Sequence, residues 1–194
     1  MAVLQLNEPK MRRWTREEYY QMAELGWFVN QRVMLLDGEI VEMPVQKSGH
    51  YVSIDKAAKI LERIFSVGFW VRTQAPLDLG VNSDPEPDVA VVSGSREDYL
   101  ASHPTTALLI IEVSDTTLRF DRNRKCSLYA CGGITDYWIV NLVDRQLEIR
   151  RNPVPDSSQE YGYGYADLTI LSLADFATPL AAPQVQIAVA DLLP

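Results

Sequence analysis

Short apolar runs separated by turn residues dominate the middle of the chain. Residues 107–111 are apolar without a break, follow the turn-forming sequence His-Pro-Thr-Thr, and lead directly into Glu112. A short run bounded in this way is typical of a strand that is buried on both faces. Residues 88–92 and 137–141 are also predicted to be strands, since all of them except Asp88 and Asn141 are apolar. The pattern therefore predicts a central sheet, and it places a carboxylate at the end of one buried strand.

Two helices and a β-hairpin are predicted before these strands, within residues 15–65. A capping box at Thr15 predicts a first helix that runs to about residue 25. Residues 33–36 and 40–43 flank the dipeptide Asp-Gly, which is a strong signal for a β-hairpin. Residues 49–65 carry apolar side chains at helical spacing and charged side chains on the opposite side.

The remaining pattern predicts a mixed fold. We expect strands at residues 69–74, 77–79 and 147–151, a helix at residues 120–131, and weaker strands near residues 161–165 and 185–189. This irregular order predicts an α/β (α+β) protein with a mixed central β-sheet flanked by helices, rather than a doubly wound sheet. We expect one domain over residues 1–194, with a core at about residues 15–151 and a C-terminal extension at residues 152–194.

The composition is that of a globular protein able to bury a core. Hydrophobic residues make up 47% of the chain and charged residues 23%, so neither disulfides nor a structural metal are needed for stability. Cys126 and Cys131 fall on different faces of one predicted helix, which favours free thiols and a cytoplasmic location. No apolar window approaches the length of about 18 residues that a membrane span needs, so no membrane partner is expected. The formal net charge of −8 argues against a general basic surface for nucleic acid.

Two carboxylates are predicted to meet at one edge of the sheet. Asp88 opens its strand and Glu112 closes the next, so they lie side by side if the strands are antiparallel neighbours. Close carboxylates repel and need a cation, and oxygen ligands favour Mg²⁺ or Mn²⁺. Lys125 lies four residues from both Asp121 and Tyr129, so these three share a helix face. This set suits phosphodiester hydrolysis, with Lys125 stabilising charge in the transition state.

The ordered motifs resemble those of the PD-(D/E)XK nuclease superfamily. They are Pro87-Asp88, Glu112-Val113-Ser114, Asp121-x-x-x-Lys125-x-x-x-Tyr129-x-x-Gly132-Gly133 and Asp136-Tyr137-Trp138-Ile139-Val140. Within that superfamily the chain is similar, over about residues 15–151, to a large bacterial family of restriction-endonuclease-like proteins. The hairpin at residues 35–41 and His50 also fit that family.

The resemblance implies a restriction-endonuclease-like core and a metal-dependent endonuclease that hydrolyses phosphodiester bonds of DNA. Asp88, Glu112 and Lys125 would be its catalytic residues. Asp88, Glu112 and the carbonyl of Val113 would bind Mg²⁺ (or Mn²⁺). The superfamily lysine normally stands two residues after the glutamate, where this chain has Ser114, and Lys125 would replace it from the helix.

Several other polar residues are candidates for a supporting role. The candidate auxiliary residues are His50, Asp121 and Tyr129, and the candidate phosphate-binding residues are Arg119, Arg122 and Arg124. These arginines, with Lys125, form the only basic cluster next to the predicted site, although such clusters are usually solvated faces. Asp88 could equally cap a turn, and Glu112 could pair with Lys125 or Arg119 in a purely structural role.

Three functions are compatible with the sequence. The first is the Mg²⁺-dependent endonuclease, with DNA as its substrate. The second is a catalytically weakened family member that binds nucleic acid or protein, because Met34 stands where the family pattern usually has an auxiliary glutamate. The third is a structural or regulatory homodimer. Its interface would be the predicted sheet edge at residues 147–151 or the tyrosine-rich tail.

Overall fold

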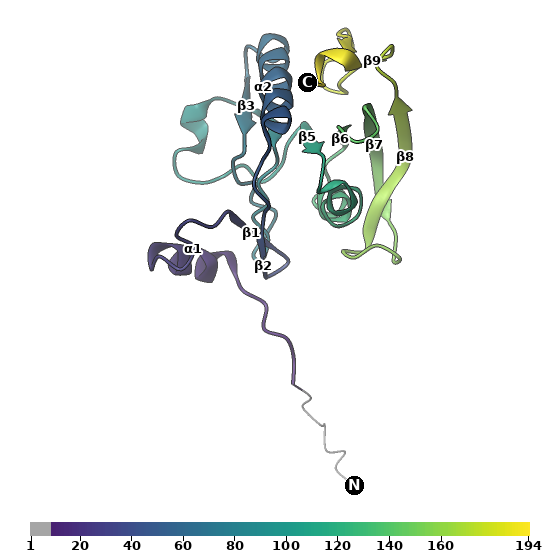
Figure 1. Cartoon of the computed structure of the whole chain (residues 1–194). Helices are drawn as coiled ribbons and strands as arrows, with labels where there is room; N and C mark the ends of the chain where they lie inside the picture. The colour runs from purple at the N-terminus through teal and green to yellow at the C-terminus, as the bar shows by residue number, and fades with distance from the viewer. Residues whose placement is uncertain (1–8) are drawn as a thin grey trace.

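A mixed six-stranded sheet forms the centre of the computed structural model, which describes residues 9–194 (Figure 1). The sheet strands are β3 (Phe69–Thr73), β4 (Val89–Ser93), β5 (Leu109–Ser114), β6 (Asp136–Asn141), β7 (Gln146–Pro155) and β8 (Tyr163–Leu171), in that spatial order. Only β5 and β6 run parallel, and the other neighbours are antiparallel. The prediction of a mixed central sheet flanked by helices is therefore confirmed.

The remaining elements surround this sheet. The helices are α1 (Arg16–Glu24), α2 (Ser48–Ile64), η1 (Arg96–Tyr99), α3 (Leu118–Phe120), η2 (Asp121–Lys125), α4 (Cys126–Cys131) and η3 (Val189–Asp191). The other strands are β1 (Val33–Leu36), β2 (Glu39–Glu42), β9 (Phe176–Ala177) and β10 (Ile187–Ala188). None of the helices within residues 9–194 has the length and apolar character that a membrane crossing needs.

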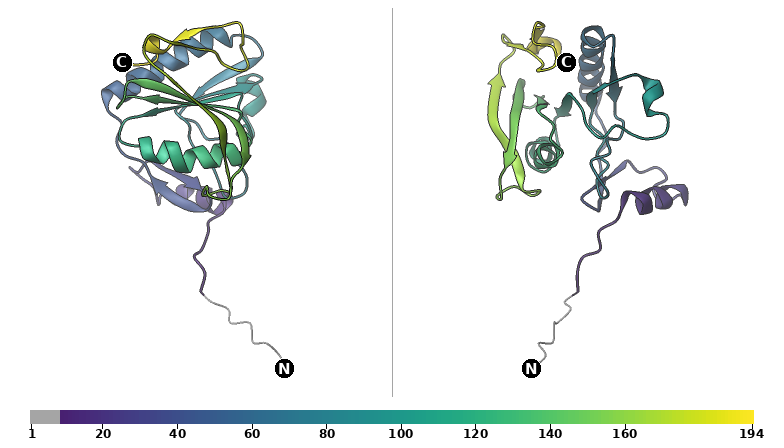
Figure 2. Two further views of the ribbon diagram at one scale, coloured as in Figure 1. Left: turned by 90° about the vertical axis from the view of Figure 1, so that its right-hand side faces the viewer. Right: turned by 180° about the vertical axis from the view of Figure 1, so that it is seen from behind.

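Each face of the sheet is covered by a different part of the chain (Figure 2). Helix α2 and the segment from β9 to η3 pack on one face, where Leu61, Ile111 and Val189 belong to one apolar cluster. Helix α4 packs on the other face, where Ile110 and Tyr129 belong to a second cluster. Alternation along β5 thus directs odd-numbered residues toward α2 and even-numbered residues toward α4.

Local signals in the N-terminal third are confirmed. The hydroxyl of Thr15 accepts a hydrogen bond from the N–H of Glu18, whose carboxylate accepts one from the N–H of Thr15, so the capping box is complete. Asp37 and Gly38 join β1 to β2 with φ angles of 47° and 75°. A Cβ at Gly38 would lie 2.6 Å from the Cβ of Arg13, so only glycine fits this turn.

The strand predicted at residues 77–79 is wrong. These residues lie in the loop after β3, where the N–H groups of Leu77 and Asp78 donate to the carbonyls of Pro85 and Pro104 at 2.9 Å each. Leu77 is fully buried in the cluster beneath α4. Its apolar character therefore reflects core packing by a loop and not membership of a strand.

The C-terminal third contains more strand than predicted. Strand β7 continues to Pro155 rather than ending at residue 151, β8 spans nine residues rather than residues 161–165, and β9 was not predicted. Strand β8 lies at the sheet edge with most of its side chains exposed, so it lacks the apolar alternation that marks a half-buried strand. Residues 147–151 are not a sheet edge, contrary to prediction, because β8 pairs with that side of β7.

Candidate active site

Asp88 and Glu112 lie side by side at the end of adjacent strands. Strands β4 and β5 are antiparallel with Val89 opposite Ile111, as the prediction required. The N–H of Asp88 donates to Oε2 of Glu112 at 3.4 Å, and the N–H of Val113 donates to Oδ2 of Asp88 at 2.9 Å. Both carboxylates line one cavity, and both are buried. The structure thus brings the two predicted acidic residues together.

Lys125 places its ammonium against Glu112. Its Nζ lies 2.8 Å from Oε1 of Glu112 and 3.7 Å from Oδ1 of Asp121, and the side chain is almost fully buried. The segment that carries Asp121 and Lys125 is a π-helical turn, η2, inserted between α3 and α4. Such turns are rare and often occur at functional sites. The predicted helix at residues 120–131 is therefore present, with a local widening that apolar spacing does not reveal.

Tyr129 completes the contacts of the Glu112 carboxylate. Its hydroxyl donates to Oε1 of Glu112 at 2.6 Å, and its side chain is fully buried. Tyr137 packs against it edge to face, with ring centroids 5.1 Å apart. Tyr129 therefore holds the orientation of Glu112 from the side of α4.

Removal of this hydroxyl should weaken the folded state. The Tyr129→Phe variant would leave Oε1 of Glu112 without one of its two donors, and hydrogen bonds to charged groups contribute about 1.5–3 kcal/mol. We expect the free energy of unfolding, measured by urea denaturation, to fall by about 1.5 kcal/mol. The Tyr163→Phe variant is the control, because the exposed Tyr163 hydroxyl makes no hydrogen bond to residues 9–194. Equal stability of the two variants would contradict a supporting role for Tyr129.

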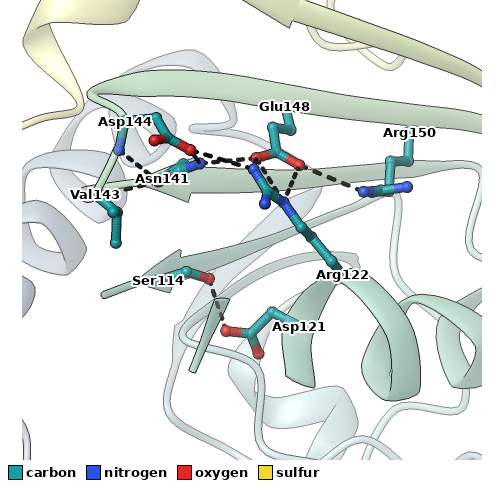
Figure 3. A network of polar contacts seen from close by, with 8 residues as sticks. All are labelled: Ser114, Asp121, Arg122, Asn141, Val143, Asp144, Glu148 and Arg150. Carbon is teal, nitrogen blue, oxygen red and sulfur yellow. Dashed lines mark hydrogen bonds and ion pairs between the residues drawn. The ribbon is translucent and has the colours of Figure 1, made fainter. Parts of the chain in front are cut away.

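Ser114 holds Asp121 rather than acting on its own. The hydroxyl of Ser114 donates to Oδ2 of Asp121 at 2.7 Å, as Figure 3 shows, and the hydroxyl of Thr117 donates to the same atom at 2.7 Å. Both donors come from the end of β5 or the loop after it. The residue that occupies the usual lysine position therefore orients a carboxylate that faces Lys125.

His50 and two glutamines contact the Asp88 side of the site. Nε2 of His50 lies 3.4 Å from Oδ2 of Asp88 and 3.4 Å from Nε2 of Gln46. The side-chain amide of Gln74 donates to Oδ1 of Asp88 at 3.4 Å. Gln74 has a φ of 47°, which is uncommon for a residue other than glycine. The sequence analysis missed both glutamines, and the only available indication was that Gln74 ends a strand adjacent to that of Asp88.

The charges in the cavity do not balance. Three buried carboxylates, those of Asp88, Glu112 and Asp121, surround the one ammonium of Lys125. Burial, together with the charges of Asp88 and Asp121, raises the pKa of Glu112 to about 8 against the opposing charge of Lys125. Burial alone would lower the pKa of Lys125, but Glu112 and Asp121 outweigh it and hold that pKa above its ordinary value. The three carboxylates therefore disfavour one another's ionised forms, and a further cation beside Asp88 and Glu112 would favour the ionised form of Glu112.

The oxygen atoms in the cavity suit Mg²⁺ or Mn²⁺ better than a metal ion that is coordinated entirely by side chains. Among residues 9–194, no three His, Cys, Asp or Glu side chains converge closely enough to hold an ion by themselves. Asp88 and Glu112 supply two carboxylates. The N–H of Val113 faces Asp88, and the carbonyl of the same strand residue points to the same side. Since Mg²⁺ is usually held by one or two carboxylates and several waters, these residues fit such an ion.

The predicted phosphate-binding arginines lie outside the cavity. Nε of Arg122 donates to both carboxylate oxygens of Glu148 at 3.0 and 3.1 Å (Figure 3). Arg124 is paired with Glu39 at 2.6 Å. Arg119 is exposed. None of the three lines the cavity that contains Asp88, Glu112 and Lys125. The structure therefore does not bring these arginines to the site.

Two features of the β1–β2 hairpin bear on the site. Met34 is buried in an apolar cluster with Leu36 and Leu128, so this position supplies no carboxylate. Arg32, just before β1, lines the cavity and was not among the predicted site residues. Its sequence position at the start of a hairpin carries no indication of this role, because the contact depends on how the hairpin packs against the sheet.

Comparisons with known proteins show the family and the fold of the chain. A family model, Uma2, described as "Putative restriction endonuclease", matches residues 16–190. Among solved structures, a protein of Anabaena variabilis ATCC 29413, described as "a putative nuclease belonging to DUF820", has a TM-score of 0.68, and the match covers 92% of this chain and 96% of that one. The sequence identity is 12%, so this likeness shows a shared fold. No curated protein matches the chain.

Proposed function

This chain belongs to the Uma2 family of restriction-endonuclease-like proteins, and from that premise we propose that it is a metal-dependent endonuclease that hydrolyses phosphodiester bonds of DNA. The family and the structural neighbour support a nuclease-like role. The observation that carries the proposal further is the cluster of three buried carboxylates beside Lys125 in one cavity at the paired ends of β4 and β5.

In this proposal, Asp88, Glu112 and the carbonyl of Val113 hold Mg²⁺ or Mn²⁺. When bound, the ion would supply Lewis-acid chemistry for hydrolysis of a phosphate diester. The chain supports this arrangement from both sides. His50 and Gln74 contact the carboxylate of Asp88, whereas Tyr129 contacts that of Glu112.

Lys125 has the role of a positive charge beside the reacting phosphate. Its ammonium stays protonated because Glu112 and Asp121 raise its pKa. A fixed cation in a site that excludes water stabilises negative charge as it develops in the transition state. Ser114 and Thr117 orient Asp121 and thereby hold the ammonium in place.

Cleavage of supercoiled plasmid DNA tests the proposal. We expect nicking in the presence of Mg²⁺ or Mn²⁺ and none in EDTA. The Asp88→Asn variant should lower the rate by at least about 100-fold, because it removes charge from the site of the ion. It should also weaken Mg²⁺ binding in calorimetry. The Asp55→Asn variant, which changes a carboxylate on the exposed side of α2, should match the wild type.

An absence of cleavage of both plasmid DNA and RNA with either ion would contradict the proposal. A second candidate, a family member that binds nucleic acid or protein without turnover, is favoured by one observation. Met34 contributes no carboxylate to the region beside the cavity. This second candidate would be supported if the protein binds DNA while calorimetry detects no heat of Mg²⁺ binding at millimolar concentrations.

A further inference from the structure

Arg32 is one of the residues that line the carboxylate cavity. It directly precedes β1, and its carbonyl accepts a hydrogen bond of 2.7 Å from the N–H of Met43, a residue that also lines the cavity. Arg32 is partly exposed, whereas Lys125 is buried. The cavity therefore has one cation within it and a second that also reaches solvent.

Other basic groups of this region are engaged by carboxylates of the protein. Lys125 contacts Glu112 at 2.8 Å, and Lys47, which precedes α2, lies 3.3 Å from Asp115. Within the described part of the chain, the guanidinium of Arg32 forms no ion pair and no side-chain hydrogen bond. Its five N–H donors therefore have no partner among residues 9–194 and suit binding of a ligand.

The charge of the cavity determines which ligand suits Arg32. The excess of carboxylates would repel a phosphate diester unless a cation faced it. Arg32 lines this cavity and is partly exposed, so it is placed to offset negative charge toward a bound phosphate. A planar guanidinium matches phosphate oxygens in pairs.

We propose that Arg32 binds a backbone phosphate of duplex DNA next to the scissile phosphate and thereby positions the strand over Asp88 and Glu112. This inference rests on the proposed nuclease function and deepens it, because it names the residue that recognises the substrate backbone. It assigns to the start of the hairpin the role that the sequence analysis gave to Arg119, Arg122 and Arg124.

The test compares Arg32→Gln with the wild type at several NaCl concentrations. With Mg²⁺, we expect KM for a duplex oligonucleotide to rise about tenfold at low salt, with kcat changed less than about threefold, since the contact is to a non-reacting phosphate. Fluorescence anisotropy with Ca²⁺ in place of Mg²⁺ measures binding separately from cleavage. The slope of log K against log[NaCl] should become shallower by about 0.9, the value for one lost phosphate contact.

Three further variants sharpen the comparison. Arg32→Lys keeps the charge and should therefore keep the wild-type slope of log K against log[NaCl]. It should recover only part of the affinity for DNA, because a lysine cannot pair with two phosphate oxygens. Arg96→Gln changes an exposed arginine on η1, away from the cavity, and should match the wild type. Arg119→Gln tests the competing assignment directly.

The outcomes separate this inference from the proposed function. Cleavage with an unchanged KM and salt slope in Arg32→Gln would overturn the role of Arg32 and leave the nuclease proposal intact. If the slope of log K against log[NaCl] becomes shallower in Arg32→Gln but the wild type cleaves no DNA, the role of Arg32 is supported and the nuclease proposal is contradicted. A wild type that binds no DNA, or a slope that changes in Arg119→Gln instead, would overturn the inference.

Discussion

The Lys125→Met variant should lose about 1000-fold in the rate of DNA cleavage and at least about 3 kcal/mol in the free energy of unfolding. Methionine has a similar length but no charge, so the variant would leave three buried carboxylates with no ammonium between them. Removal of one partner from a buried ion pair costs about 3–5 kcal/mol, because the remaining charge is uncompensated.

The metal dependence of this stability loss is the informative measurement. Urea denaturation of Lys125→Met should show a large gain in stability on addition of Mg²⁺, of about 2.7 kcal/mol at a concentration 100 times the Kd. Cleavage should stay lost under the same conditions. The Lys59→Met variant replaces an exposed lysine of α2 and should behave as the wild type. If Lys125→Met cleaves DNA at the rate of the wild type, Lys125 is not a catalytic residue.

The Arg122→Ala variant should lower the free energy of unfolding by about 3 kcal/mol and leave DNA affinity unchanged. Glu148 is 1% exposed in the interior of the sheet, on β7, and Arg122 binds both of its carboxylate oxygens from the helical segment η2. Asn141 and Arg150 also contact Glu148 (Figure 3), so its charge would keep partial compensation. For a chain of 194 residues, the expected fall in Tm is about 6–12 °C.

Calorimetric melting and anisotropy with duplex DNA together decide this prediction. The Arg119→Ala variant is the matched control for stability, because it is an exposed arginine on the preceding turn and should change the free energy of unfolding by less than about 0.5 kcal/mol. An Arg122→Ala protein that melts like the wild type but binds DNA weakly would instead identify Arg122 as a phosphate contact.

The acidic part of the site was predictable because it depends on short-range patterns. Apolar runs fixed the positions of the strands, and alternation along them put Asp88 and Glu112 on the face covered by α4. Helical spacing then placed Lys125 on the same helix face as Asp121 and Tyr129. The convergence of Asp88 and Glu112 depended on antiparallel pairing of the two strands and also on the register, Val89 opposite Ile111, which the sequence left open.

The basic part of the site was not predictable from such patterns. Arg122 and Arg124 are close to Lys125 in sequence, but their partners, Glu148 and Glu39, come from distant strands. Local charge clustering does not indicate which carboxylates will neutralise an arginine after folding. Arg32 reaches the cavity only because the hairpin packs beside the helical segment, a tertiary contact with no periodic signature.

The order of the strands also bears on the kinetics of folding. In the central sheet, every strand lies beside the strand that precedes or follows it in the sequence, so each pairing closes a comparatively short loop. The segment at residues 187–193 is different, because it packs on α2, and the ammonium of Lys56 donates to the carbonyl of Leu193, 137 residues away. Contacts across so long a separation form late in folding when shorter loops can close first, so we expect the closure of the core between α2 and the C-terminal segment to be a late step.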